Sequence, residues 1–245
     1  MTRIASGITA AMKSLLLRNG IKVERYNSIS SHELRLVQML TSNHIDLVLD
    51  VGASTGHYAK SIRASGYRGR ILSFEPLALA HAALVNASRT DEFWAAAPRM
   101  ALGQVNGTVT INVAGNSTSS SMLDMLESHR RASPQSSYVA QEVVDVCRLD
   151  SVSHPFVDEA ASPFLKIDTQ GYESQVLAGS EKCLDRIRGL QLELSLQPLY
   201  EGQRLWKDMI ATAEAAGFDL WALVPGFFDP TNGRLLQCDA MFFRR

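Results

Sequence analysis

The residues with the clearest chemical meaning form a glycine turn between an expected strand and an expected helix. Residues 50–56 read DVGASTG, and Glu75 ends the strand that follows. Gly52 and Gly56 allow a tight turn and a close approach of the backbone to a ligand, while the start of the helix offers unpaired N–H groups to an anion. An acid after the second strand typically accepts hydrogen bonds from ribose hydroxyls. The pattern therefore predicts a site for a cofactor that contains a nucleoside.

The spacing of the two glycines disfavours several better-known motifs. It does not fit G-x-G-x-x-G, which disfavours a pyrophosphate-binding dinucleotide site. His57 stands where a P-loop requires lysine, which excludes a nucleotide triphosphatase. The turn also matches the hydrolase motif G-x-S-x-G around Ser54. A hydrolase is disfavoured, because few strands can precede the turn and no segment before it could form an oxyanion hole. A cofactor with a ribose and a carboxylate but no phosphate remains.

Two acids on later strands are the candidates for acceptor chemistry. Alternation in residues 164–168 places Lys166 and Asp168 on one side of a strand, with Asp168 at the carboxyl end, where open α/β sheets bind ligands. Asp168 could be a general base or an orienting group held by Lys166, and a purely structural ion pair is the alternative. Glu193 lies inside another strand, where an acid must be paired or functional. The two acids lack a third fixed ligand, so we predict no metal.

Short apolar runs alternate with helical patterns along the chain, which is typical of β-α units around a largely parallel sheet. The expected strands cover residues 45–51, 70–74, 96–102, 109–113, 143–147, 164–167, 190–196, 219–224 and 240–243. One expected helix passes through residues 58–62, and the other expected helices cover residues 77–88, 172–184 and 203–216. The last two strands have no helix between them and should pair antiparallel. We expect an α/β fold with a sheet of seven strands or more.

Two segments lie outside this repeating pattern. Residues 1–43 form an N-terminal helical segment before the domain of residues 44–245, and residues 4–17 carry apolar side chains such as Ile4 and Ile8 at helical spacing near basic residues. This helix could touch a membrane surface peripherally, but we expect it to pack on its own domain. The serine-rich residues 115–137 suggest a mobile insertion, either an idle surface loop or a substrate lid.

The composition limits the classes of function that the chain can have. Its 245 residues are 46% hydrophobic and carry a net charge of -1, as expected of a globular domain without electrostatic attraction to nucleic acid. The 3 cysteines match neither a disulfide framework nor a zinc site, and we expect reduced thiols in a cytoplasmic protein. No apolar run is long enough to span a membrane.

Several separated motifs together resemble the FkbM family of S-adenosylmethionine-dependent methyltransferases over most of residues 44–243. The matching segments are 49–58 (LDVGASTGHY, with serine where asparagine is commoner), 74–76 (FEP), 148–151 (RLDS), 164–173 (FLKIDTQGYE), 176–179 (VLAG) and 239–244 (DAMFFR). The resemblance implies a Rossmann-like methyltransferase fold of seven strands with the last antiparallel. It also implies S-adenosyl-L-methionine as cofactor and methylation of a hydroxyl, on a sugar of a glycan or glycolipid or on a polyketide-type metabolite.

The resemblance, together with the strand ends, assigns roles to single residues. On the cofactor, we expect Asp50 near the amino group, Glu75 on the ribose, Ala101 near the adenine, and Gly52, Ser54 and Gly56 around the methionyl part. On the acceptor side, we expect Asp168 and Glu193 as catalytic groups and His57, Lys166 and Tyr200 as substrate contacts. An inactive scaffold of the same fold is the alternative, and the intact cofactor motifs favour the enzyme.

Overall fold

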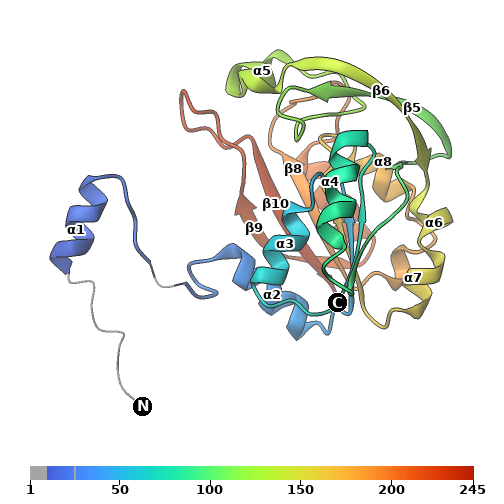
Figure 1. Ribbon diagram of the computed structural model, residues 1–245, viewed down its shortest axis with the longest axis horizontal. Coiled ribbons are helices and arrows are strands. Elements are labelled where there is room, and N and C mark those ends of the chain that lie inside the picture. Colours follow the sequence, from blue (N-terminus) through green and yellow to red (C-terminus); the bar gives the residue numbers. More distant parts are fainter. Residues whose placement is uncertain (1–9, 25) are drawn as a thin grey trace.

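The computed structural model describes residues 10–24 and 26–245. Helix α1 (Ala10–Arg18) lies apart from the rest of the chain (Figure 1). The side chains of Leu15 and Leu17 are 61% and 64% exposed, so the expectation that this helix packs on its own domain is wrong within the described residues. The next helix, α2 (His32–Ser42), covers the adjacent face of the sheet through Leu36 and Leu40. Ile4 and Ile8 lie outside the described residues.

A seven-stranded sheet forms the centre of the domain, in the order β3-β2-β1-β7-β8-β10-β9. Its strands are β1 (Leu47–Val51), β2 (Arg70–Phe74), β3 (Trp94–Ala96), β7 (Pro163–Ile167), β8 (Gly189–Ser195), β9 (Phe218–Pro225) and β10 (Gln237–Arg244). The strands from β3 to β8 run parallel, whereas β10 is antiparallel to both of its neighbours. This confirms the predicted α/β class, the mostly parallel sheet and its antiparallel last strand.

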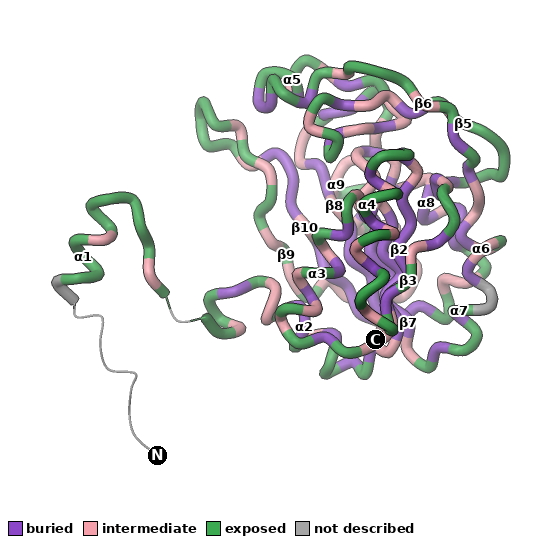
Figure 2. Tube along the Cα trace, in the orientation of Figure 1, coloured by how far each residue is buried: buried purple, intermediate pink, exposed green. Residues whose placement is uncertain are grey.

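Helices cover both faces of the sheet, which explains why its strands are continuous apolar runs. On one face lie α2, α3 (His57–Ala64) and α4 (Ala78–Ser88), packed on side chains such as Val48 and Phe164. On the other face lie α6 (Leu149–Val152), α7 (His154–Glu159), α8 (Glu173–Ala178) and α9 (Trp206–Ala215), packed on side chains such as Leu49 and Leu165. The central strands are accordingly buried along their length (Figure 2).

A smaller sheet sits over one end of the main sheet and corrects part of the sequence prediction (Figure 1). It holds β4 (Ala101–Leu102), β5 (Gly107–Ala114) and β6 (Tyr138–Cys147), so the expected strands 109–113 and 143–147 pair with each other outside the main sheet. The expected strand 96–102 is split between the two sheets, because Pro98 has no N–H to continue a ladder.

Residues 115–137 connect β5 to β6 and contain α5 (Glu127–Ala132) and a short 3-10 helix (Pro134–Ser136). The segment is attached to the body of the domain by a β-bridge between Met125 and Tyr200. The expected helix 172–184 is also shorter than predicted. It ends at Ala178, and a 3-10 helix (Leu184–Arg186) follows. The backbone at Gly179 approaches the Gly103 carbonyl oxygen so closely that a Cβ would not fit.

Candidate active site

A cavity of about 750 Å³ opens at the carboxyl ends of the parallel strands. Its walls come from the glycine turn after β1, the loops after β2 and β7, and residues 116–122 of the segment between β5 and β6. Open α/β sheets bind ligands at this edge because the helix N-termini and strand ends face it. The serine-rich segment therefore forms part of the wall of the candidate site.

The glycine turn is built so that only glycine fits at its first position. Gly52 has a φ of +75, and a Cβ there would lie 1.8 Å from the backbone carbonyl oxygen of Asp168. Ser54 also has a positive φ, of 49, and its N–H donates a hydrogen bond of 2.8 Å to Glu75 Oε2. The loops after β1, β2 and β7 are thus fixed to one another at the cavity.

Glu75 presents a carboxylate to the cavity while both of its oxygens are already oriented. Oε2 accepts from Ser54 N, and Oε1 accepts from Leu77 N at 2.9 Å. Burial raises the pKa of Glu75, and the two N–H donors oppose that shift. Each oxygen keeps a further lone pair, which suits hydroxyl donors such as those of a ribose. The apolar side chains of Met100 and Ala101 line the cavity as well, so these residues fit a nucleoside.

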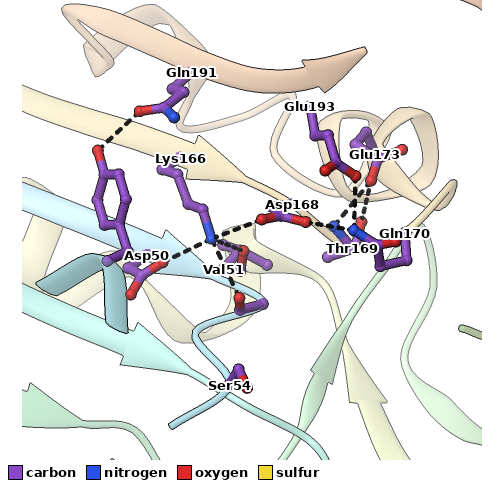
Figure 3. Close-up of polar contacts among 12 residues, drawn as sticks. Asp50, Val51, Ser54, Lys166, Asp168, Thr169, Gln170, Glu173, Gln191 and Glu193 are labelled. Atoms are coloured by element: carbon purple, nitrogen blue, oxygen red, sulfur yellow. Dashed lines mark hydrogen bonds and ion pairs between the residues drawn. The ribbon is translucent and has the colours of Figure 1, made fainter. Parts of the chain in front are cut away.

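Asp50 and Lys166 form a buried ion pair (Figure 3). Lys166 lines the cavity, and Asp50 lies behind it. Lys166 Nζ lies 3.1 Å from Asp50 Oδ1 and donates to the carbonyl oxygen of Gly52 at 3.2 Å. Burial lowers the pKa of Lys166, but the Asp50 and Asp168 carboxylates outweigh it and raise that pKa. Asp50 is fully buried, with a hydrogen bond from Ser73 Oγ, and does not line the cavity. Asp50 supports the turn through Lys166, and its place near the amino group of the cofactor stays a prediction.

The two predicted catalytic acids meet through one glutamine (Figure 3). Gln170 Nε2 donates to Asp168 Oδ1 at 2.9 Å and to Glu193 Oε2 at 2.7 Å. Lys166 Nζ lies 3.6 Å from Asp168 Oδ2, so both oxygens of this carboxylate are oriented. The Asp168 side chain remains 34% exposed and lines the cavity. Asp168 is thus both positioned and accessible.

Glu193 lies deeper and in more negative surroundings. Burial raises its pKa well above the usual range, and the nearby carboxylates of Asp168, Glu173 and Asp239 raise it further. Asp239 is its direct partner in the register of β8 and β10, and burial raises the pKa of Asp239 too. Sequence reasoning gave no role to Asp239 or Gln170. The alternation of side chains between the two faces of β10 could have indicated Asp239, whereas no local sequence pattern indicates Gln170.

Of three other residues that were predicted to contact the cofactor or substrate, one lines the cavity and two do not. His57 lines the cavity, but Gly56 and Tyr200 do not. Gly56 has a φ of +82 at the start of α3, and a Cβ there would lie 2.6 Å from the ring of Trp94, so it serves packing. Tyr200 is fully buried, with its hydroxyl 2.9 Å from Gln170 Oε1. Tyr200 thus supports the glutamine between the acids, and its contact with substrate stays a prediction.

The described residues, 10–24 and 26–245, lack two features. They contain no group of three histidine, cysteine or acidic side chains that could hold a metal ion. None of the helices among them is long and apolar enough to cross a membrane.

Comparisons with known proteins give a family and a set of similar folds. A family model described as the methyltransferase FkbM domain matches residues 50–220. No curated protein matches the chain. Similar solved structures include magnesium protoporphyrin IX methyltransferase of Synechocystis PCC 6803 with bound S-adenosylmethionine, at 10% identity, a TM-score of 0.48 and 100% coverage of each chain.

Two further structures of similar fold are methyltransferases or bind the same cofactor. Aeropyrum pernix fibrillarin, with natively bound S-adenosylmethionine, has 12% identity and a TM-score of 0.46, with 88% of this chain and 76% of that chain covered. An rRNA methylase of Streptococcus thermophilus has 10% identity and a TM-score of 0.46, with 91% of this chain and 99% of that chain covered.

Proposed function

Because this chain belongs to the FkbM methyltransferase family, whose cofactor is S-adenosylmethionine, we propose that it methylates a hydroxyl oxygen of a small acceptor. The acceptor classes are the sugar of a glycan or glycolipid and a polyketide-type metabolite. One observation carries the proposal. The oriented carboxylates of Glu75 and Asp168 open into the same cavity on either side of the glycine turn, which suits a nucleoside at the first and a reacting hydroxyl at the second.

The cofactor would be held by residues that fit its parts. The turn at Gly52 and Ser54 would accommodate the methionyl part, Glu75 would accept hydrogen bonds from the ribose, and Ala101 would border the adenine. When bound, S-adenosylmethionine supplies a methyl group activated by a positively charged sulfur. The task left to the chain is to place an oxygen and to remove its proton.

Asp168 takes the proton of the acceptor hydroxyl in this proposal. Gln170 fixes one oxygen of its carboxylate and Lys166 lies near the other, so the base has a defined direction toward the cavity. A positioned general base typically contributes ~10²–10⁴ in rate. Glu193 is the second candidate, because its raised pKa makes it the stronger base while its burial makes it the less accessible one.

Helix α1 provides a route to acceptors carried on a membrane. Leu15 and Leu17 are exposed on it, close to the cations Lys13 and Arg18. Positions two apart lie on different faces of a helix, so such a helix can place one of these leucines in a lipid interface while its cations contact anionic headgroups. We therefore include peripheral membrane contact in the proposal, tested by sedimentation with anionic vesicles. Loss of binding in a Leu15→Glu, Leu17→Glu variant supports it, and unchanged binding contradicts it.

Calorimetric binding of S-adenosylmethionine and S-adenosylhomocysteine tests the cofactor site. Wild type should bind both, and Glu75→Ala should weaken binding by about 10-fold or more, because hydrogen bonds to a charged partner are lost. Glu92→Ala changes an exposed acid on the surface and should leave the affinity unchanged. A folded wild type that binds neither compound would contradict the proposal and favour an inactive scaffold.

Methyl transfer to hydroxyls of glycolipids and polyketides then tests the reaction itself. With a responsive acceptor, Asp168→Asn should lower kcat by about 100-fold or more and leave the affinity for S-adenosylhomocysteine within about 3-fold of wild type. Equal kcat values for Asp168→Asn and wild type would remove Asp168 from the role of base.

A further inference from the structure

The charged side chains that line the cavity are mostly acidic. In the described part of the chain, the lining carboxylates are Glu33, Glu75, Asp168, Glu193 and Asp239. Lys166 is the one lysine or arginine among the described lining residues, and Asp50, directly behind it, already pairs with it at 3.1 Å. Fields in a concave, partly buried site are stronger than on an open surface. Away from the N–H groups of the glycine turn, the cavity therefore favours cations over anions.

Glu193 and Asp239 are the acids with the least compensation. They are direct partners across β8 and β10, and among the described residues neither has a lysine or arginine at salt-bridge distance. Glu193 Oε2 instead accepts from the amides of Gln170 and Gln237, each at 2.7 Å. Amide dipoles orient a carboxylate but do not cancel its charge, and like charges on neighbouring strands repel each other. Lys166 lowers the pKa of both acids but lies beyond salt-bridge distance of them, so this pair is only partly compensated.

His129 gives an independent sign that a ligand belongs in the same cavity. Its side chain lies in α5, is only 2% exposed and lines the cavity. The ring packs against those of Tyr200 and Phe227, with centroids 5.1 and 5.3 Å away, and Nδ1 has no hydrogen-bond partner. Burial lowers the pKa of His129 to about 4, so the ring is neutral near pH 7. A buried ring nitrogen without a partner is uncommon in folded proteins, and a ligand with N–H or O–H groups would satisfy it.

The cofactor alone does not balance the charge of this site. S-adenosylmethionine carries one carboxylate, one ammonium and one sulfonium group, so it brings a net charge of about +1 against several carboxylates. No three acidic, histidine or cysteine side chains of the described residues converge as metal ligands do, so an organic cation fits better than a metal ion. An ammonium group offers three N–H donors to carboxylates and to a neutral imidazole.

We propose that the acceptor is an amino alcohol or amino sugar, whose protonated amine lies against Glu193 and Asp239 while its hydroxyl faces Asp168. This inference rests on the proposed function and names the substrate class of that site. The amine takes no part in the transfer and serves to bind and orient the acceptor. The same charges disfavour phosphorylated and carboxylated acceptors at this end of the cavity, and a neutral acceptor would leave the acid pair without a cation in contact.

A matched set of small probes tests the charge preference without knowledge of the acceptor. Benzylammonium, benzyl alcohol and benzoate have the same ring and differ in charge, and their binding to wild type saturated with S-adenosylhomocysteine is measured by ligand-observed NMR. Benzylammonium should bind about 10-fold more tightly than benzyl alcohol, and benzoate should not bind. Benzylammonium binding should also release protons to the buffer, measured by calorimetry in buffers of different ionisation enthalpy, because a cation lowers the raised pKa values of Glu193 and Asp239.

The variant Glu193→Gln, Asp239→Asn removes both charges with little change of shape. It should bring benzylammonium and benzyl alcohol to within about 2-fold of each other. Asp208→Asn, an exposed acid on α9, is the control and should keep the wild-type preference. Equal binding of the two probes to wild type, no detectable benzylammonium binding at about 10 mM, or a preference kept in the double variant would each overturn the inference.

Binding of S-adenosylhomocysteine separates this result from the proposed function. If wild type binds S-adenosylhomocysteine without preferring the ammonium probe, the cationic acceptor is wrong and the methyltransferase proposal stands. If S-adenosylhomocysteine itself does not bind, the proposed methyltransferase function is contradicted, and the inference about the acceptor falls with it.

Discussion

Replacing Lys166 by methionine should destabilise the fold far more than an ordinary surface change. The substitution removes the cation that pairs with the fully buried Asp50 at 3.1 Å and leaves that carboxylate with the hydroxyl of Ser73. Removing one partner of a buried ion pair typically costs about 3–5 kcal/mol, because the other charge stays uncompensated. In a domain of this size, each kcal/mol corresponds to roughly 2–4 °C in Tm.

The free energy of unfolding is measured by urea denaturation at pH 7 with tryptophan fluorescence. Trp94 is a suitable reporter, because its indole N–H donates to Ser73 Oγ, which in turn donates to Asp50. The double variant Asp50→Asn, Lys166→Met removes both charges and should recover at least about 1 kcal/mol relative to Lys166→Met alone.

The matched control is Lys60→Met, which changes an exposed lysine on α3 and should shift stability by less than about 0.5 kcal/mol. A Lys166→Met protein within about 1 kcal/mol of wild type would refute the reasoning, because Asp50 would then have lost its charge or found another partner. A double variant less stable than Lys166→Met would also refute it, since the cost would then lie in packing.

Three further predictions concern the turn, a buried acid and the support of Asp168. Gly52→Ala should weaken S-adenosylhomocysteine binding by about 10-fold or more, measured by calorimetry, because its Cβ would meet the Asp168 carbonyl at 1.8 Å; Gly66→Ala, with positive φ but open space, is the control. Burial raises the pKa of Glu173 to about 7, so the folded state holds its proton more tightly than the unfolded state. Stability should fall by up to about 3 kcal/mol as pH rises from 5 to 8, and urea unfolding of Glu173→Gln should show a smaller fall; an unchanged slope contradicts this. Tyr200→Phe removes the hydroxyl near Gln170 and should lower kcat on a responsive acceptor while the affinity for S-adenosylhomocysteine stays the same, and a change in affinity alone would contradict it.

The main sheet could be predicted because its strands are short apolar runs with clear ends. The run at residues 45–51 is buried on both faces and stops at a glycine turn, and residues 70–74 were assigned with their observed bounds. The pattern of β5 and β6 is also strand-like, but alternation reports which face of a strand is buried and not which strand it pairs with. Their placement in a second sheet depends on contacts between distant residues and was missed.

In the candidate site too, some positions follow from local sequence and others depend on contacts between distant residues. The positions of Gly52 and Asp168 follow from local sequence, because each comes directly after a buried strand. The pairing of Asp50 with Lys166 depends on the register between β1 and β7, where the two residues are direct partners, and no local pattern encodes that register. The link that Gln170 makes between Asp168 and Glu193 depends on its own φ of +54 and on a neighbouring strand.

The position of β10 also affects how this chain can fold while it is being synthesised. β8 and β9 do not pair with each other, and β10 joins them from the inside of the sheet. Until residues 237–244 have left the ribosome, the edge of β8, with Leu190, Leu192 and Leu194, has no partner on that side. Such an apolar edge favours association with other chains. Completion of the main sheet therefore waits for β10, and the nascent chain must be kept from aggregating until that strand is inserted.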